Sequence, residues 1–230
     1  MKRMALALAL FAAFMSTGCL QKDTTSTVYL RQDGSLDWFV SERNVRSDEA
    51  DAAKRAREET VYLDAIGRDE HDVAKWFRRL GGANVRTRLL RDTRPYTVVV
   101  DAQFNSLSDL VGRPLTACGV PHHVDLTKDG GVTTWRLWAD VGEDGGNVSQ
   151  TESDDCGTDV DGLADALPFT IVLESGQFTH AEGFTLEGSD TARIDEAATN
   201  PDALKQNRGQ VVFSLSWTSH GIQALTPSGV

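Results

Sequence analysis

Two pairs of side chains have the types and spacing that metal binding requires. Each pair is a histidine and a carboxylate two residues apart in a stretch that reads as a strand, namely His123 with Asp125 and His180 with Glu182. Because alternate residues of a strand share a face, each pair offers one nitrogen and one oxygen to a zinc ion. A four-ligand site needs the two strands to be neighbours, which the sequence does not show. Solvated polar faces are therefore the preferred interpretation.

An acidic stretch with interspersed glycines, residues 142–162, is a second candidate for chemistry. Its oxygen ligands have a density that calcium accepts, and the four candidates are Asp154, Asp155, Asp159 and Asp161. The spacing is not that of an EF-hand, because Gly and Glu do not fall at the required positions. We expect a solvated acidic loop here, with calcium as the alternative, and no cofactor.

The common catalytic motifs are absent from the sequence. It has no Gly-x-Ser-x-Gly elbow, no phosphate-binding loop, no dinucleotide-binding glycine pattern and no His-Glu-x-x-His helix. This favours a binding or structural protein over an enzyme, and a hydrolase is the enzyme class kept as an alternative.

Six arginines lie close together in an acidic chain: Arg78, Arg79, Arg86, Arg88, Arg91 and Arg94. We expect Arg78 and Arg79 to interact favourably with the dipole at the C-terminal end of a helix. We expect the other four to pair with acidic groups from the second half of the chain. Contact with membrane phosphates is the alternative.

The elements that position these residues are mostly strands. Strands are expected at residues 25–31, 36–46, 85–91, 96–104, 124–127, 132–141, 169–174, 177–186 and 210–218, with Asp-Gly turns that indicate hairpins. A helix is expected from a cap at Ser47 to about Ile66, and a short one follows Asn105 or Ser106. The expectation is a single α+β domain, residues 25–219: an antiparallel sheet of about eight strands with two helices packed on one side.

The strongest helical pattern lies in residues 69–80. Its apolar residues recur at i, i+3, i+4 and i+7: Val73, Trp76, Phe77 and Leu80. Such a stripe is usually core, so we expect it to pack on the first hairpin and on residues 96–104. A face for an apolar ligand or partner is the alternative.

The N-terminus has the order of a secretory signal. Lys2 and Arg3 precede an apolar run that is too short to span a membrane, and Ser16-Thr17-Gly18-Cys19 follows. This stretch resembles the type II signal of bacterial lipoproteins. The resemblance implies removal of residues 1–18 and a diacylglycerol on the Cys19 sulfur. Residues 19–24 would then be a polar tether, and an ordinary cleaved signal with an incidental cysteine is the alternative.

The other two cysteines, Cys118 and Cys156, are expected to form a disulfide, because an exported protein meets an oxidising compartment. Two buried free thiols are the alternative. Residues 220–230 are polar and contain Gly and Pro, so a flexible tail is expected.

Charge and composition limit the classes of partner that the protein can bind. The net charge is −11, and loss of the two basic signal residues makes it −13, which argues against nucleic acid. Residues 19–94 hold 15 Lys/Arg and 14 Asp/Glu, whereas residues 95–230 hold 6 Lys/Arg and 20 Asp/Glu.

The arrangement of strands and helices after a lipoprotein-like signal is similar to that of envelope lipoproteins. These include a mycobacterial family whose β-rich domains end in an apolar strand with a Trp near its close, as residues 211–218 do. We expect a membrane-anchored module of the cell envelope that binds an envelope protein or a small apolar ligand, or has a structural role. A hydrolase or an apolar-ligand carrier is the alternative.

Overall fold

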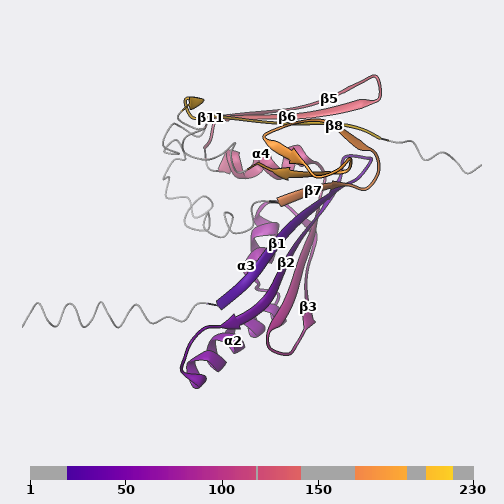
Figure 1. Cartoon of the computed structure of the whole chain (residues 1–230). Coiled ribbons are helices and arrows are strands. Elements are labelled where there is room, and N and C mark those ends of the chain that lie inside the picture. The colour runs from indigo at the N-terminus through magenta and orange to yellow at the C-terminus, as the bar shows by residue number, and fades with distance from the viewer. Residues whose placement is uncertain (1–19, 118, 141–168, 196–205, 220–230) are drawn as a thin grey trace, which may run out of the picture.

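A computed structural model describes residues 20–117, 119–140, 169–195 and 206–219. These residues form a seven-stranded sheet, a four-stranded sheet and helices that pack against them (Figure 1). The α+β class expected from the sequence is confirmed.

A long hairpin forms the centre of the large sheet. Its strands β1 (Leu20–Leu30) and β2 (Leu36–Ser47) pair from Leu20 opposite Ser47 to Leu30 opposite Leu36. The structure therefore places residues 20–24 in β1, where the sequence suggested a tether. Backbone hydrogen bonds to β2 extend the strand to this point even though four of these five residues, Gln21 to Thr24, are polar.

Five further strands complete the large sheet. They are β3 (Ala83–Arg91), β4 (Tyr96–Phe104), β7 (Phe169–Leu173), β9 (Phe184–Leu186) and β10 (Thr191–Ile194), in the order β3-β4-β2-β1-β7-β10-β9. All neighbours are antiparallel except β1 and β7, which are parallel.

The smaller sheet is antiparallel and lies at the turn end of the hairpin (Figure 1). Its order is β5 (His122–Asp129), β6 (Val132–Asp140), β11 (Gln210–Thr218) and β8 (Gln177–Glu182).

Gly183 explains why there are two sheets where the sequence suggested one. It separates β8 from β9 with a φ of 74°, so the strand expected over residues 177–186 turns a corner. On one side of the corner β8 pairs with β11, and on the other side β9 pairs with β10. A Cβ at Gly183 would lie 2.5 Å from a Phe213 ring carbon, so the corner requires glycine.

The helices begin at local caps. In α2 (Ala52–Gly67) the Asp51 carboxylate accepts the backbone N–H groups of Ala53 and Lys54 at 2.9 Å, so Asp51 is the N-cap and the expected cap, Ser47, ends β2. Helix α3 (Asp72–Arg79) follows after a short turn. Helix α4 (Leu107–Ala117) begins with Ser106 Oγ accepting the Asp109 N–H at 3.0 Å.

Helix α3 fills the core of the large sheet. Phe77 is fully buried, with ring centroids 5.0 Å from Trp38 and 5.9 Å from Phe104, and Trp76 packs half-buried at 4.9 Å from Trp38. The stripe predicted from the sequence is thus core, and its neighbours are the predicted hairpin and β4.

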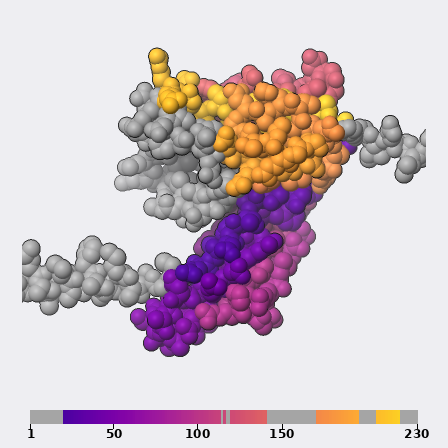
Figure 2. All heavy atoms as spheres, viewed as in Figure 1, coloured from indigo at the N-terminus to yellow at the C-terminus, as the bar shows by residue number. Residues whose placement is uncertain are grey.

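In the part of the chain that the structure describes, no helix has the length and apolar content to cross a bilayer. Figure 2 shows that the β1–β4 part is narrow and that the part containing β8–β10 is broader.

Candidate functional site

A buried carboxylate lies beneath the helical layer. Glu42 on β2 is 1% exposed, and three elements each supply one partner. Lys22 Nζ on β1 donates to Oε1 at 2.8 Å, and the Tyr62 hydroxyl on α2 donates to Oε2 at 2.7 Å. His71 Nε2, at the start of α3, lies 3.2 Å from Oε2. The cluster therefore joins β1, β2, α2 and α3 at one point.

The partners keep Glu42 ionised. Burial acts to raise the pKa of Glu42, but the hydrogen bonds and charges of His71 and Lys22 outweigh it and lower the pKa from 4.5 to about 2. Burial, with the negative charge of Glu42, raises the pKa of Tyr62, so its hydroxyl remains a donor. At neutral pH Glu42 is thus a fixed acceptor, which suits organising a site better than transferring a proton.

An open groove of about 750 Å³ lies beside this cluster. One wall is a single face of α2, whose residues recur at helical spacing: Lys54, Arg57, Glu58, Val61, Tyr62 and Ala65. The start of β1 contributes Leu20 and Lys22, and the start of α3 contributes His71, Asp72 and Lys75. A hollow of this size can accommodate a small molecule or a headgroup. Its charged rim favours a polar or ionic ligand.

Helix α2 is also held to the sheet by polar contacts. Glu59, a buried residue of this helix, accepts the Ser47 backbone N–H at 3.1 Å and lies 3.0 Å from Arg94 Nε. The Tyr96 hydroxyl donates to its other oxygen at 3.4 Å. These bonds fix the wall of the groove on the sheet.

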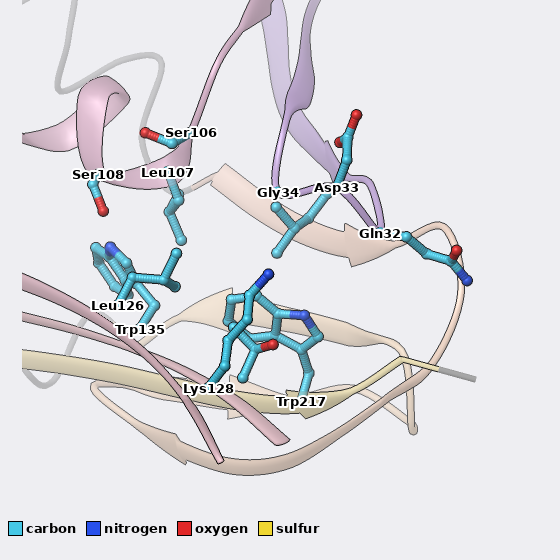
Figure 3. Close-up of a pocket in the computed structure, with 12 residues that line it drawn as sticks. Gln32, Asp33, Gly34, Ser106, Leu107, Ser108, Leu126, Lys128, Trp135 and Trp217 are labelled. Carbon is cyan, nitrogen blue, oxygen red and sulfur yellow. The ribbon is translucent and has the colours of Figure 1, made fainter. Parts of the chain in front are cut away.

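A second hollow lies where the two sheets meet. Figure 3 shows Trp135, Lys128 and Trp217 on one side of it and Leu107 and the turn at Gly34 on the other. Its volume is about 30 Å³. Such a space holds a water molecule but no organic ligand, and the buried Trp135 Nε1 has no hydrogen-bond partner among the described residues.

The two histidine pairs considered for zinc do not come together. Strands β5 and β8 are the opposite edges of the small sheet, three strand spacings apart, or about 14 Å. His123 and Asp125 form an exposed pair at 2.9 Å. Within the described ranges no three His, Cys, Asp or Glu residues are placed to hold a metal ion.

The remaining site residues predicted from the sequence lie outside the described ranges. They are Cys19, Cys118, Cys156, Asp154, Asp155, Asp159 and Asp161. Lipidation, the disulfide and the calcium alternative therefore stay predictions, as do the acidic loop and the flexible tail.

Several of the clustered arginines pair with carboxylates, as expected. Asp101, which is 3% exposed, binds Arg86 through Oδ2 at 2.6 Å and Arg88 through Oδ1 at 2.9 Å. Arg94 pairs with Glu59, which belongs to the first half of the chain rather than the second.

Glu42 and its partners were not identified from the sequence. The available signal was the alternation of β2, because Leu36, Trp38 and Val40 face the core and Glu42 is the next residue on that side. An inward-facing carboxylate needs partners. Nothing in the sequence showed that Tyr62 and His71 would supply them.

The fold and groove define an α+β protein with a charged groove at one end of its large sheet. The sequence matches no family model and no curated protein. The structure is similar, with a TM-score of 0.34 and 11% identity, to the NMR structure of the folded domain of Mycobacterium tuberculosis LppM, over 89% of this chain and 93% of that one. A likeness at this level assigns neither a family nor an activity.

Proposed function

We propose that the protein is a lipoprotein of the bacterial cell envelope, held to a membrane by acyl chains on Cys19, and that its folded part binds a ligand or partner there. The observation that carries the proposal is the position of Leu20. This residue begins β1 and lines the groove, and it directly follows the cysteine of the lipoprotein-like signal. Acylation at Cys19 would bring the groove end of the molecule close to the bilayer.

The geometry supports binding better than catalysis. The most perturbed carboxylate described, Glu42, has its pKa lowered to about 2 and is enclosed by three side chains. A general acid or base works best with a pKa near the working pH and with access to the substrate. The groove, in contrast, is open and large enough for a ligand.

The carrier alternative finds less support in the described residues. The hollow at the junction of the sheets, about 30 Å³, is too small for an acyl chain. The larger groove is lined by seven charged residues: Lys22, Lys54, Arg57, Glu58, Glu70, Asp72 and Lys75. Charged walls of this kind disfavour a purely apolar ligand.

Substitution of Cys19 tests the anchor. Two acyl chains, at about 0.8 kcal/mol per buried CH₂, hold a protein firmly to a bilayer. Cys19→Ser should therefore move the protein from the membrane fraction to the soluble fraction, while Cys118→Ser should leave it in the membrane. Mass spectrometry of the native peptide that begins at residue 19 should show the acyl mass. An unmodified peptide would instead indicate plain secretion.

A further inference from the structure

The groove beside Glu42 has basic residues that the fold does not use. Glu58 accepts a hydrogen bond from Ser47 Oγ, and Glu70 lies 3.3 Å from Arg68. In contrast, Lys54 and Arg57 are exposed and make no ion pair with any described residue. They lie three residues apart on the face of α2 that lines the groove, so their side chains are neighbours.

The inner end of the groove adds a polar group that lacks a partner. His71 is 4% exposed and lines the groove. Its Nε2 faces Glu42, whereas its Nδ1 is buried and has no hydrogen-bond partner among the residues described. This nitrogen is an unsatisfied polar atom beside the groove, on the same ring that holds Glu42.

The position of the groove points to the source of its ligand. Leu20 lines it, and Leu20 directly follows in the sequence the cysteine proposed to carry the anchor. If Cys19 carries a diacylglycerol, the groove lies at the depth of the lipid headgroups. The anions available there are phosphodiesters, which Lys and Arg side chains bind well. Val61, 59% exposed on the same wall, is an apolar contact suited to this interface.

We infer that this groove binds the phosphate of an anionic lipid headgroup in the membrane that carries the anchor, with Lys54 and Arg57 as its charged contacts. The inference rests on the proposed function for the location of the groove. The net charge of the anchored form, −11 less the two basic signal residues, is −13 and repels an anionic bilayer, so attraction must be local. One headgroup in one groove meets that condition.

Vesicle binding by unacylated protein that begins at residue 19 and carries Cys19→Ser tests the groove without the anchor or the apolar signal. The protein should bind phosphatidylcholine vesicles that contain phosphatidylglycerol more tightly than vesicles of phosphatidylcholine alone. Each basic residue near an anionic surface strengthens binding by about fivefold, so Lys54→Gln with Arg57→Gln should weaken it by about 25-fold. Both residues are exposed and unpaired, so the thermal midpoint should not change.

A matched variant separates this site from general charge attraction. Arg43 and Arg46 are exposed on β2, near the same end of the large sheet, and do not line the groove. Arg43→Gln with Arg46→Gln removes the same charge and should leave vesicle binding within about twofold. Equal losses in the two double variants, or no preference for phosphatidylglycerol in the parent, would overturn the inference.

Soluble phosphate distinguishes the source of the ligand. Inorganic phosphate should compete with phosphatidylglycerol vesicles only weakly, because it lacks the bilayer that holds the headgroup in place. Competition at a concentration similar to that of the lipid phosphate would overturn the lipid assignment in favour of a free-phosphate site. The acyl mass at residue 19 is measured separately, so a failure of the anchor and a failure of the groove give different results.

Discussion

The buried carboxylate of Glu42 makes the stability of the folded protein depend on pH. Its pKa is about 2 in the folded protein against an ordinary value of 4.5, so the ionised form favours folding. The resulting stability is present above about pH 4.5 and is lost as the pH falls toward 2. The difference corresponds to about 3 kcal/mol at neutral pH, since each pKa unit is worth about 1.4 kcal/mol.

Glu42→Gln should therefore destabilise the protein at neutral pH and much less in acid. Urea denaturation of both proteins at several pH values from 7 to 2.5 measures the difference in the free energy of unfolding. We expect about 3 kcal/mol near pH 7 and a steady narrowing below pH 4.5. Glu70→Gln, at an exposed residue, is the control and should change little at any pH. A difference that stays constant down to pH 2.5 would show that Glu42 acts by packing rather than by charge.

Sequence patterns at the residue scale identified the exposed groups better than the buried ones. The His123–Asp125 pair was visible from its spacing and is on the surface. Glu42 was visible only as a polar residue in an apolar alternation, and its partners Lys22, Tyr62 and His71 come from three other elements. A cluster assembled from distant segments has no local signature, so only the folded structure reveals it.

At the scale of elements, α3 is the helix whose buried face and neighbours were predicted most completely from the sequence. Phe77→Ala should cost about 3 to 5 kcal/mol, because the ring is fully buried between Trp38 and Phe104. Trp76→Ala should cost less, because Trp76 is half-buried on the edge of the same cluster. Thermal and urea melts measure both, with Lys75→Ala as an exposed control on the same helix. A small effect of Phe77→Ala would contradict its place in the core.

Helix α2 shows that a sequence can predict a helix without predicting how the helix packs on the sheet. The helix is present and ends at Gly67, close to the expected end at Ile66, although its N-cap is Asp51 rather than the expected Ser47. The face toward the sheet, however, uses Glu59 and Tyr62, whose partners are polar atoms of β2 and β4. Hydrophobic periodicity carries no information about such polar contacts, so it did not predict how this helix packs on the sheet.

The corner at Gly183 is a second feature of this scale. Gly183→Ala combines a φ of 74° with a Cβ 2.5 Å from the Phe213 ring and 2.9 Å from the Val212 carbonyl oxygen. We expect a loss of about 2 to 4 kcal/mol in the free energy of unfolding, from backbone strain together with the steric clash. Gly130→Ala is the control, because Gly130 has a φ of 55° and open space around its Cβ position. Similar losses at both glycines would show that the contact with Phe213 is unimportant.

At the scale of the whole molecule, the strand pairings are what the sequence could not supply. The hairpin of β1 and β2 and the hairpin of β5 and β6 were predicted from their turns, and both are present. The parallel pairing of β1 with β7, and the position of β11 between β6 and β8, join segments far apart in the chain. Strand patterns specify which face is buried but not which strand is the neighbour. The class was therefore predictable, whereas the division into two sheets was not.

A disulfide between Cys118 and Cys156 would act on the molecule as a whole, since it would close a loop of about 39 residues. The chain-entropy estimate for such a loop is about 4 kcal/mol, an upper value that any strain in the native bond reduces. Cys118 directly follows α4, a helix that contacts β4 and β5, so the bond would join the end of this helix to the acidic stretch of the chain.

Peptide mapping without reductant should recover Cys118 and Cys156 in one cross-linked fragment. A reductant should then lower the thermal midpoint of the native protein but not that of the Cys118→Ser, Cys156→Ser double variant. Each single variant should be as unstable as the double variant, because either substitution removes the same bond. If both thiols of the unreduced, denatured protein react with an alkylating reagent, the cysteines are free and the predicted disulfide is absent.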